Sequence, residues 1–183
     1  MSKTILCFGD SLTAGYGMQR GQSYPELLQE HINNDGYNYQ VINAGVSGDT
    51  TNDGLRRLSY NLSQPIDIFI LELGVNDIMR GKSPEQIKVN LARILNEVKR
   101  HHSHSKLVVA GMELPPVIQH PFVSRFTGIY RSLAQEYTAH LIPHFLDGVL
   151  GISALNLPDR LHPNAQGYQI IARNVYEQIK GLL

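Results

Sequence analysis

Cysteine, tryptophan and an excess of either charge are what this chain has least of. One cysteine and no tryptophan occur in 183 residues, so a framework of intramolecular disulfides is excluded. Cys7 lies inside an apolar run, which predicts a buried structural thiol and suits a reducing compartment. Sixteen basic and sixteen acidic residues leave no net charge, and no run of one sign is long enough to attract a phosphate backbone. Nucleic acid is therefore not an expected partner.

Long hydrophobic runs are also missing. No apolar stretch approaches the ~20 residues that a membrane-spanning helix needs, so stable membrane insertion is not expected. The first residues, MSKTILCFGDS, lack a charged leader followed by a long apolar stretch. As written, the chain is expected to be cytoplasmic. A periplasmic location stays open, because a processed or re-engineered N-terminus would read the same.

Short apolar runs alternate with amphipathic helical patterns along the whole chain, without a linker or a repeat, which predicts a single domain over residues 1–183. Strands are expected at residues 4–8, 39–43, 67–73, 107–112 and 140–145. Helices are indicated between them by cap and proline signals at Ser23-Tyr-Pro-Glu26 and Ser83-Pro84. Apolar strands separated by helices predict an α/β fold, a three-layer, doubly wound parallel sheet.

Open parallel sheets bind ligands at the carboxyl ends of their strands. The loops expected there cover residues 9–21, 44–51, 74–83, 113–124 and 146–162. Any functional site is therefore expected in these five segments.

These segments together hold the groups that a serine nucleophile requires: a base, a group that orients the base, and donors for an oxyanion. Asp159 and His162 are three residues apart, so one turn can place the carboxylate against Nδ1 of the imidazole and leave Nε2 to face Ser11. The expected oxyanion donors are the backbone N–H groups of Ser11 and Gly48 and the side-chain amide of Asn76.

Neighbouring residues offer other interpretations. Gly45 is an alternative to Gly48 as an oxyanion donor, although a turn requirement explains it better. Asp10 is adjacent to Ser11 but is expected to bond loop amides instead of acting as the triad acid. Asp49 and Asp77 are expected to have similar structural roles.

A histidine cluster, His101, His102 and His104, could suggest a metal site. These residues trail a helix end beside Lys99 and Arg100, so interaction with the helix dipole or with solvent explains them better than ligation. Neither a metal nor an organic cofactor is expected.

Four segments of the sequence resemble the signature motifs of the SGNH hydrolases, also called GDSL esterases and lipases. The matching segments, in the family's order, are Gly9-Asp-Ser-Leu12, Gly48, Gly74-Val-Asn-Asp77 and Asp159-Arg-Leu-His162. The resemblance implies the flavodoxin-like strand order 2-1-3-4-5. It also implies that Ser11, Gly48, Asn76 and His162 are the family's signature residues, with Asp159 completing the Ser-His-Asp triad.

A closer resemblance is to the compact bacterial thioesterase I, arylesterase and lysophospholipase group. It is carried by Ser47-Gly-Asp-Thr50, Leu71-Glu-Leu-Gly74 and Leu114-Pro-Pro116. It implies esterase, arylesterase, thioesterase or lysophospholipase activity on small acyl substrates. We expect a reaction through an acyl-enzyme, and a protein that is a monomer or a weak oligomer. One departure, the sequence PPVIQ at residues 115–119, lies in a loop that borders the acyl pocket in the family and puts the chain-length preference in doubt.

Two other functions stay open at this point. A carbohydrate O-acetylesterase could use the same groups, although apolar residues in the expected loops favour an acyl chain. Those residues are Val117, Ile118, Phe122, Val123, Val149, Leu150, Ile152 and Leu155. A non-enzymatic, flavodoxin-like nucleotide-binding domain would hold phosphate in residues 9–17, but this loop lacks the GxxxxGK[ST] and GxGxxG spacings and leaves Asn76, Asp159 and His162 unexplained.

Overall fold

The computed structural model describes residues 2–113 and 121–183. At its centre lies a parallel sheet made of β1 (Lys3–Gly9), β2 (Tyr39–Gly45), β3 (Ile68–Glu72), β4 (Lys106–Ala110) and β5 (His140–Ile142). The strands lie in the order β2-β1-β3-β4-β5. The order 2-1-3-4-5 implied by the resemblance is therefore confirmed.

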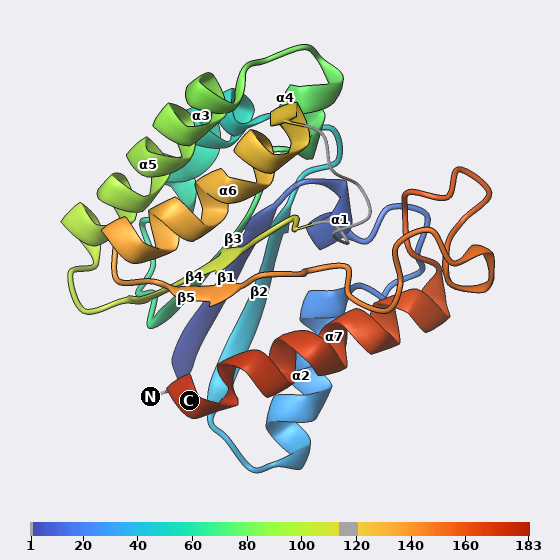
Figure 1. The fold of residues 1–183 in the computed structure, drawn as a ribbon. Coiled ribbons are helices and arrows are strands. Elements are labelled where there is room, and N and C mark those ends of the chain that lie inside the picture. The colour runs from blue at the N-terminus through green and yellow to red at the C-terminus, as the bar shows by residue number, and fades with distance from the viewer. Residues whose placement is uncertain (1, 114–120) are drawn as a thin grey trace.

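Helices cover both faces of this sheet (Figure 1). On one face α2 (Tyr24–Asn34) packs against α7 (Ala165–Ile179). On the other lie α3 (Thr51–Asn61), α5 (Pro84–His101) and α6 (Pro121–Glu136), with α5 between the other two. The three-layer, doubly wound α/β fold predicted from the sequence is confirmed. Within the described residues, none of the helices combines the length and apolar character needed to cross a bilayer.

The core forms where apolar strands meet the apolar stripes of the helices. Every residue of β3 is buried, and in α5 the buried side chains recur at helical spacing, as in Ile87, Leu91, Ile94 and Val98. This helix begins as its sequence predicts, because Ser83 caps the Gln86 N–H and proline occupies the first turn. The packed layers hold the carboxyl ends of the strands in fixed positions.

The elements differ from the sequence expectation mainly at their ends. β5 stops at Ile142, since Pro143 has no N–H group to continue the ladder. The segments expected as loops also contain short helices, α1 (Ser11–Ala14) and α4 (Val75–Met79), and a 3₁₀ turn (Ser153–Leu155), while α6 begins inside the fourth of them. A further 3₁₀ turn, Lys180–Leu182, closes the chain. Ser11 and Asn76 therefore stand on helical turns.

Candidate active site

Ser11 begins helix α1 directly after β1. The Asp10 carboxylate caps this helix, since its Oδ1 accepts the Leu12 N–H at 3.0 Å. Gly15 ends the helix in a left-handed conformation, with φ of 83°. The buried hydroxyl of Tyr168 donates to the Ser11 carbonyl at 3.3 Å. The serine is thereby held at the carboxyl end of a central strand, and Asp10 has the structural role expected of it.

His162 and Asp159 meet Ser11 from the far end of the chain. Ser11 Oγ lies 2.9 Å from His162 Nε2, and His162 Nδ1 lies 2.7 Å from Asp159 Oδ2. Asp159 Oδ1 also accepts the backbone N–H groups of Leu161, at 2.9 Å, and His162, at 3.0 Å. The structure thus brings together the three residues predicted as a triad, in the predicted order of contacts.

The Asp159 carboxylate is stabilised in its ionised form. Its pKa is lowered to about 2, because it accepts hydrogen bonds from the backbone and side chain of His162 and from the Leu161 N–H. The exposed ring of Tyr16 also lies beside the imidazole, with ring centroids 4.6 Å apart. Asp159 and Tyr16 therefore both contact the imidazole ring.

Gly48 is better placed than Gly45 to donate to an oxyanion. Its φ is +86°, its carbonyl accepts from Arg80 at 2.7 Å, and its N–H finds no acceptor in the part of the chain that the structure describes. The Gly45 N–H already donates to Asn43 Oδ1 at 2.9 Å. A side chain on Gly45 would meet the Ala14 backbone at 2.2 Å, so close approach of α1 accounts for this glycine.

Asn76 reaches the same edge of the sheet from the first turn of α4. Its Nδ2 donates to Asp10 Oδ2 and to the Asp49 carbonyl, each at 3.0 Å. Both amide hydrogens are therefore engaged within the protein. Binding of an oxyanion by Asn76 requires one of these hydrogen bonds to be exchanged or shared.

Glu72 is a buried acid that was not singled out from the sequence, and it contacts the segment that carries Asp10 and Ser11. Glu72, the last residue of β3, is fully buried, and its Oε2 accepts the Thr13 hydroxyl at 2.8 Å and the Asp10 N–H at 3.3 Å. Burial, followed by the charge of Asp10, raises the pKa of Glu72 well above its usual range. Burial also raises the pKa of Asp10, to about 6. The sequence signal that could have revealed Glu72 is an acidic residue in an otherwise apolar strand.

The remaining acids at this edge anchor loops. Asp77 accepts the Thr51 N–H at 2.8 Å and the Thr51 hydroxyl at 2.7 Å, which ties α4 to the start of α3. Asp49 accepts from Arg57 Nε at 2.5 Å. Both side chains have the structural roles predicted for them.

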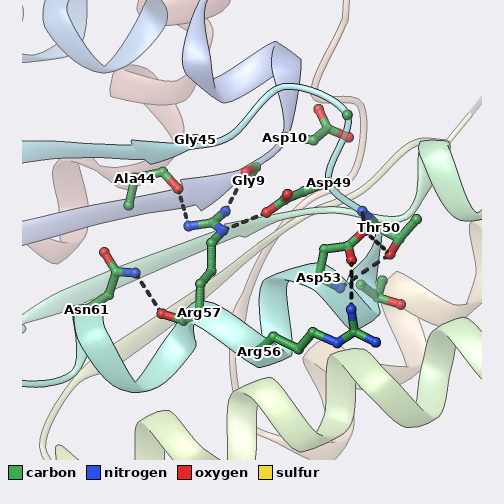
Figure 2. Close-up of polar contacts among 12 residues, drawn as sticks. Gly9, Asp10, Ala44, Gly45, Asp49, Thr50, Asp53, Arg56, Arg57 and Asn61 are labelled. Atoms are coloured by element: carbon green, nitrogen blue, oxygen red, sulfur yellow. Dashed lines mark hydrogen bonds and ion pairs between the residues drawn. The ribbon is translucent and has the colours of Figure 1, made fainter.

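Arg57 is the second residue that the sequence did not reveal (Figure 2). From α3 its guanidinium reaches Asp49 and also donates to the carbonyl of Ala44 at 2.8 Å and of Gly9 at 2.9 Å. The group lies 4.0 Å from the centroid of the Phe8 ring. One side chain therefore connects the carboxyl ends of β1 and β2 with the loop that carries Gly48.

Replacing Arg57 by methionine is expected to lower the free energy of unfolding by about 3 kcal/mol, because a partly buried carboxylate and two carbonyls lose their donor. Only 22% of the Arg57 side chain and 11% of the Asp49 side chain are exposed. Arg56→Met is the matched control, since that side chain is 76% exposed and lies 3.9 Å from Asp53. Urea unfolding of both variants checks the prediction, which equal effects would contradict.

Three of the eight apolar residues expected near the site line a hollow at the ends of β4 and β5. Val149, Leu150 and Ile152 line it together with Met112, Phe145 and Leu146, around a volume of about 440 Å³. Neither Ser11 nor His162 is among the lining residues. Phe122 and Val123 belong to α6 and Leu155 to the 3₁₀ turn. The PPVIQ departure, with Val117 and Ile118, lies outside the described residues.

The histidine cluster lies at the end of α5. His101 Nδ1 is 2.9 Å from the Glu97 carbonyl, and His102 Nε2 is 3.0 Å from the Leu62 carbonyl. Over residues 2–113 and 121–183, no three or more histidine, cysteine, aspartate or glutamate side chains are grouped so as to hold a metal ion. His101 and His102 therefore contact helix and loop carbonyls, and His104 lies edge-on to the His102 ring.

Comparison with known proteins gives the site its context. Residues 7–170 match the model of the GDSL-like lipase/acylhydrolase family. The chain is 33% identical to esterase TesA of Pseudomonas aeruginosa, over the whole chain and 90% of that protein. It is 34% identical to the thioesterase 1/protease 1/lysophospholipase L1 of Escherichia coli K12, over 98% of the chain and 85% of that protein.

Solved structures agree with this match. A crystal structure of TesA covers 99% of this chain and is itself covered completely, with a TM-score of 0.91 and 34% identity. The SGNH-hydrolase family esterase AlinE4 covers all of the chain, which covers 97% of AlinE4, with a TM-score of 0.80 and 39% identity. The sequence match and the structural match therefore agree, and this chain belongs to the GDSL-like lipase/acylhydrolase family.

Proposed function

We propose that the protein is a serine hydrolase that cleaves carboxylic esters and thioesters of acyl chains, with Ser11 as the nucleophile. The observation that carries the proposal is the continuous contact from Ser11 Oγ to His162 Nε2, at 2.9 Å, and from His162 Nδ1 to Asp159, at 2.7 Å. This is the arrangement in which an imidazole can accept the serine proton while a carboxylate stabilises the imidazolium.

The reaction follows from these contacts in two steps. Ser11 Oγ attacks the acyl carbonyl as its proton moves to His162 Nε2, and His162 then gives that proton to the leaving oxygen or sulfur. The N–H groups of Ser11 and Gly48 and the amide of Asn76 stabilise the oxyanion. Water, deprotonated by the same histidine, releases the acid from the acyl-enzyme and restores the serine.

Two observations support an apolar acyl substrate. The hollow is lined mainly by apolar side chains and lies at the carboxyl ends of β4 and β5, the same edge of the parallel sheet at which β1 leads to Ser11. Relatives covering most of the chain carry the names esterase, arylesterase and thioesterase 1/protease 1/lysophospholipase L1. These observations favour acyl esters over acetylated carbohydrate.

A fluorophosphonate probe is expected to label the protein once, at Ser11, and to stop hydrolysis of p-nitrophenyl esters in proportion to labelling, because only a serine paired with a base reacts readily. Peptide mapping by mass spectrometry locates the label. Kinetics with a series of acyl chain lengths, each as an oxygen ester and a thioester, then define the substrate. A label elsewhere would contradict the nucleophile, and preference for acetyl-xylan over a medium-chain ester would contradict the substrate class.

A further inference from the structure

Glu72 and Asp10 form a buried pair of acids directly beneath the proposed nucleophile. Glu72 is 0% exposed and Asp10 is 1% exposed. The Asp10 N–H donates to Glu72 Oε2 at 3.3 Å, which places the two acids side by side, and the charge of Asp10 adds to burial in raising the pKa of Glu72. Two neighbouring carboxyl groups that are both out of water do not both carry a charge. One proton is therefore held between them.

The other partners of the pair indicate where this proton lies. Asp10 uses both oxygens as acceptors, Oδ1 for the Leu12 N–H and Oδ2 for the Asn76 amide, each at 3.0 Å. In Glu72, Oε2 accepts from Thr13 and from the Asp10 N–H, whereas Oε1 has no donor among the described residues. An O–H at Oε1 satisfies this atom and supplies Asp10 with a further donor.

Gly9 leaves space for the Glu72 side chain. A side chain at Gly9 would place its Cβ 2.6 Å from Glu72 Oε2 and 2.1 Å from Thr13 Oγ1. The absence of a side chain at Gly9 therefore allows Glu72 to pack against the backbone of the segment that leads to Ser11.

We propose that Glu72 is a positioning residue, whose protonated carboxyl group donates to Asp10 and thereby fixes the carboxylate that holds both the Ser11 helix and the Asn76 amide. This inference rests on the proposed function. Asp10 is the link, because Oδ1 caps α1 and Oδ2 holds Asn76 Nδ2. With one amide hydrogen fixed on Asp10, only the hydrogen on the Asp49 carbonyl has to be exchanged when an oxyanion binds.

Substitutions at Glu72 separate a donor role from a charge or packing role. Glu72→Gln keeps an N–H donor toward Asp10 and an acceptor toward Thr13, so kcat for a p-nitrophenyl ester stays within about 3-fold of wild type. Glu72→Leu removes the donor and lowers kcat about 10- to 100-fold with little change in KM, because the oxyanion donors lose their alignment. An equal loss of kcat in both variants, or no loss in Glu72→Leu, overturns the proposal.

A double-mutant cycle with Asn76→Ala tests the route of the effect. If Glu72 acts through Asp10, adding Glu72→Leu to Asn76→Ala lowers kcat by a smaller factor than Glu72→Leu does in the wild type, because the part carried by the Asn76 amide is already lost, whereas a general loosening of the fold lowers kcat by the same factor in both backgrounds. Full additivity overturns the proposal. Each variant is assayed well below its own melting temperature.

Infrared spectroscopy of the wild-type protein at pH 7 keeps the proposal testable if Glu72→Leu fails to fold. We expect a carbonyl band of a protonated carboxyl group that disappears in Glu72→Gln, and its absence from the wild type overturns the proposal. This measurement needs no substrate. Failure of the proposed function, seen as undiminished activity of Ser11→Ala, is therefore distinguishable from failure of this inference.

Discussion

Ser11→Ala is expected to abolish ester hydrolysis, with kcat lowered by on the order of 10⁴-fold or more, because the nucleophilic oxygen is removed and the rest of the triad acts only through it. The fold should persist. The Ser11 side chain contributes the contact with His162, whereas α1 is held by the cap from Asp10. Steady-state kinetics on a p-nitrophenyl ester measure the loss, and circular dichroism and the melting temperature measure the fold.

Ser63→Ala is the matched control for this substitution. Ser63 is exposed beyond the end of α3, and its hydroxyl donates to the Tyr60 carbonyl at 2.8 Å. Its removal should leave kcat unchanged. Activity in Ser11→Ala equal to that of the control would remove Ser11 from the proposed reaction.

The layers of the fold were predictable from the sequence because its signals are local. Apolar runs of five to seven residues, each followed by an amphipathic pattern, indicate parallel strands and covering helices without any knowledge of distant contacts. Strand order was not predictable from these local signals, because the periodicity of a segment does not indicate which strands are neighbours in the sheet. The order 2-1-3-4-5 followed only from the resemblance. The helices α1 and α4 were missed, since four or five residues are too few to show a helical period.

The site shows the same division between local and distant information. Asp159 and His162 were predicted as a pair because they are three positions apart, and their contact is local. Arg57 and Glu72 were not predicted, because their partners lie far away in sequence: Arg57 binds Gly9 across 48 positions, and Glu72 binds Asp10 across 62. An acid in the apolar run of β3 was a visible signal, but only the fold shows that Asp10 faces it.

The third member of the proposed triad gives the second large effect. Asp159→Asn is expected to lower kcat on the order of 10³-fold, because it traps the wrong tautomer of His162. Asp159 Oδ1 accepts two backbone N–H groups, so the carbonyl oxygen of an asparagine takes that place and its NH₂ group faces Nδ1. Nδ1 must then be the acceptor, the ring proton moves to Nε2, and Nε2 cannot take the proton of Ser11.

Asp159→Ala separates this tautomer effect from simple loss of the carboxylate. Alanine leaves the imidazole free to adopt either tautomer, so this variant should retain more activity than Asp159→Asn, and the reverse order would contradict the proposed orientation of the amide.

The pH dependence of wild-type activity gives a further check on Asp159. The folded pKa of Asp159 is about 2, below its ordinary value of 3.8, so its ionised contacts are fully present above about pH 4 and are lost as the pH falls through 2. Any loss of wild-type activity between pH 7 and pH 4 must therefore come from another group, and a stopped-flow pH profile should show no inflection from Asp159 in that interval.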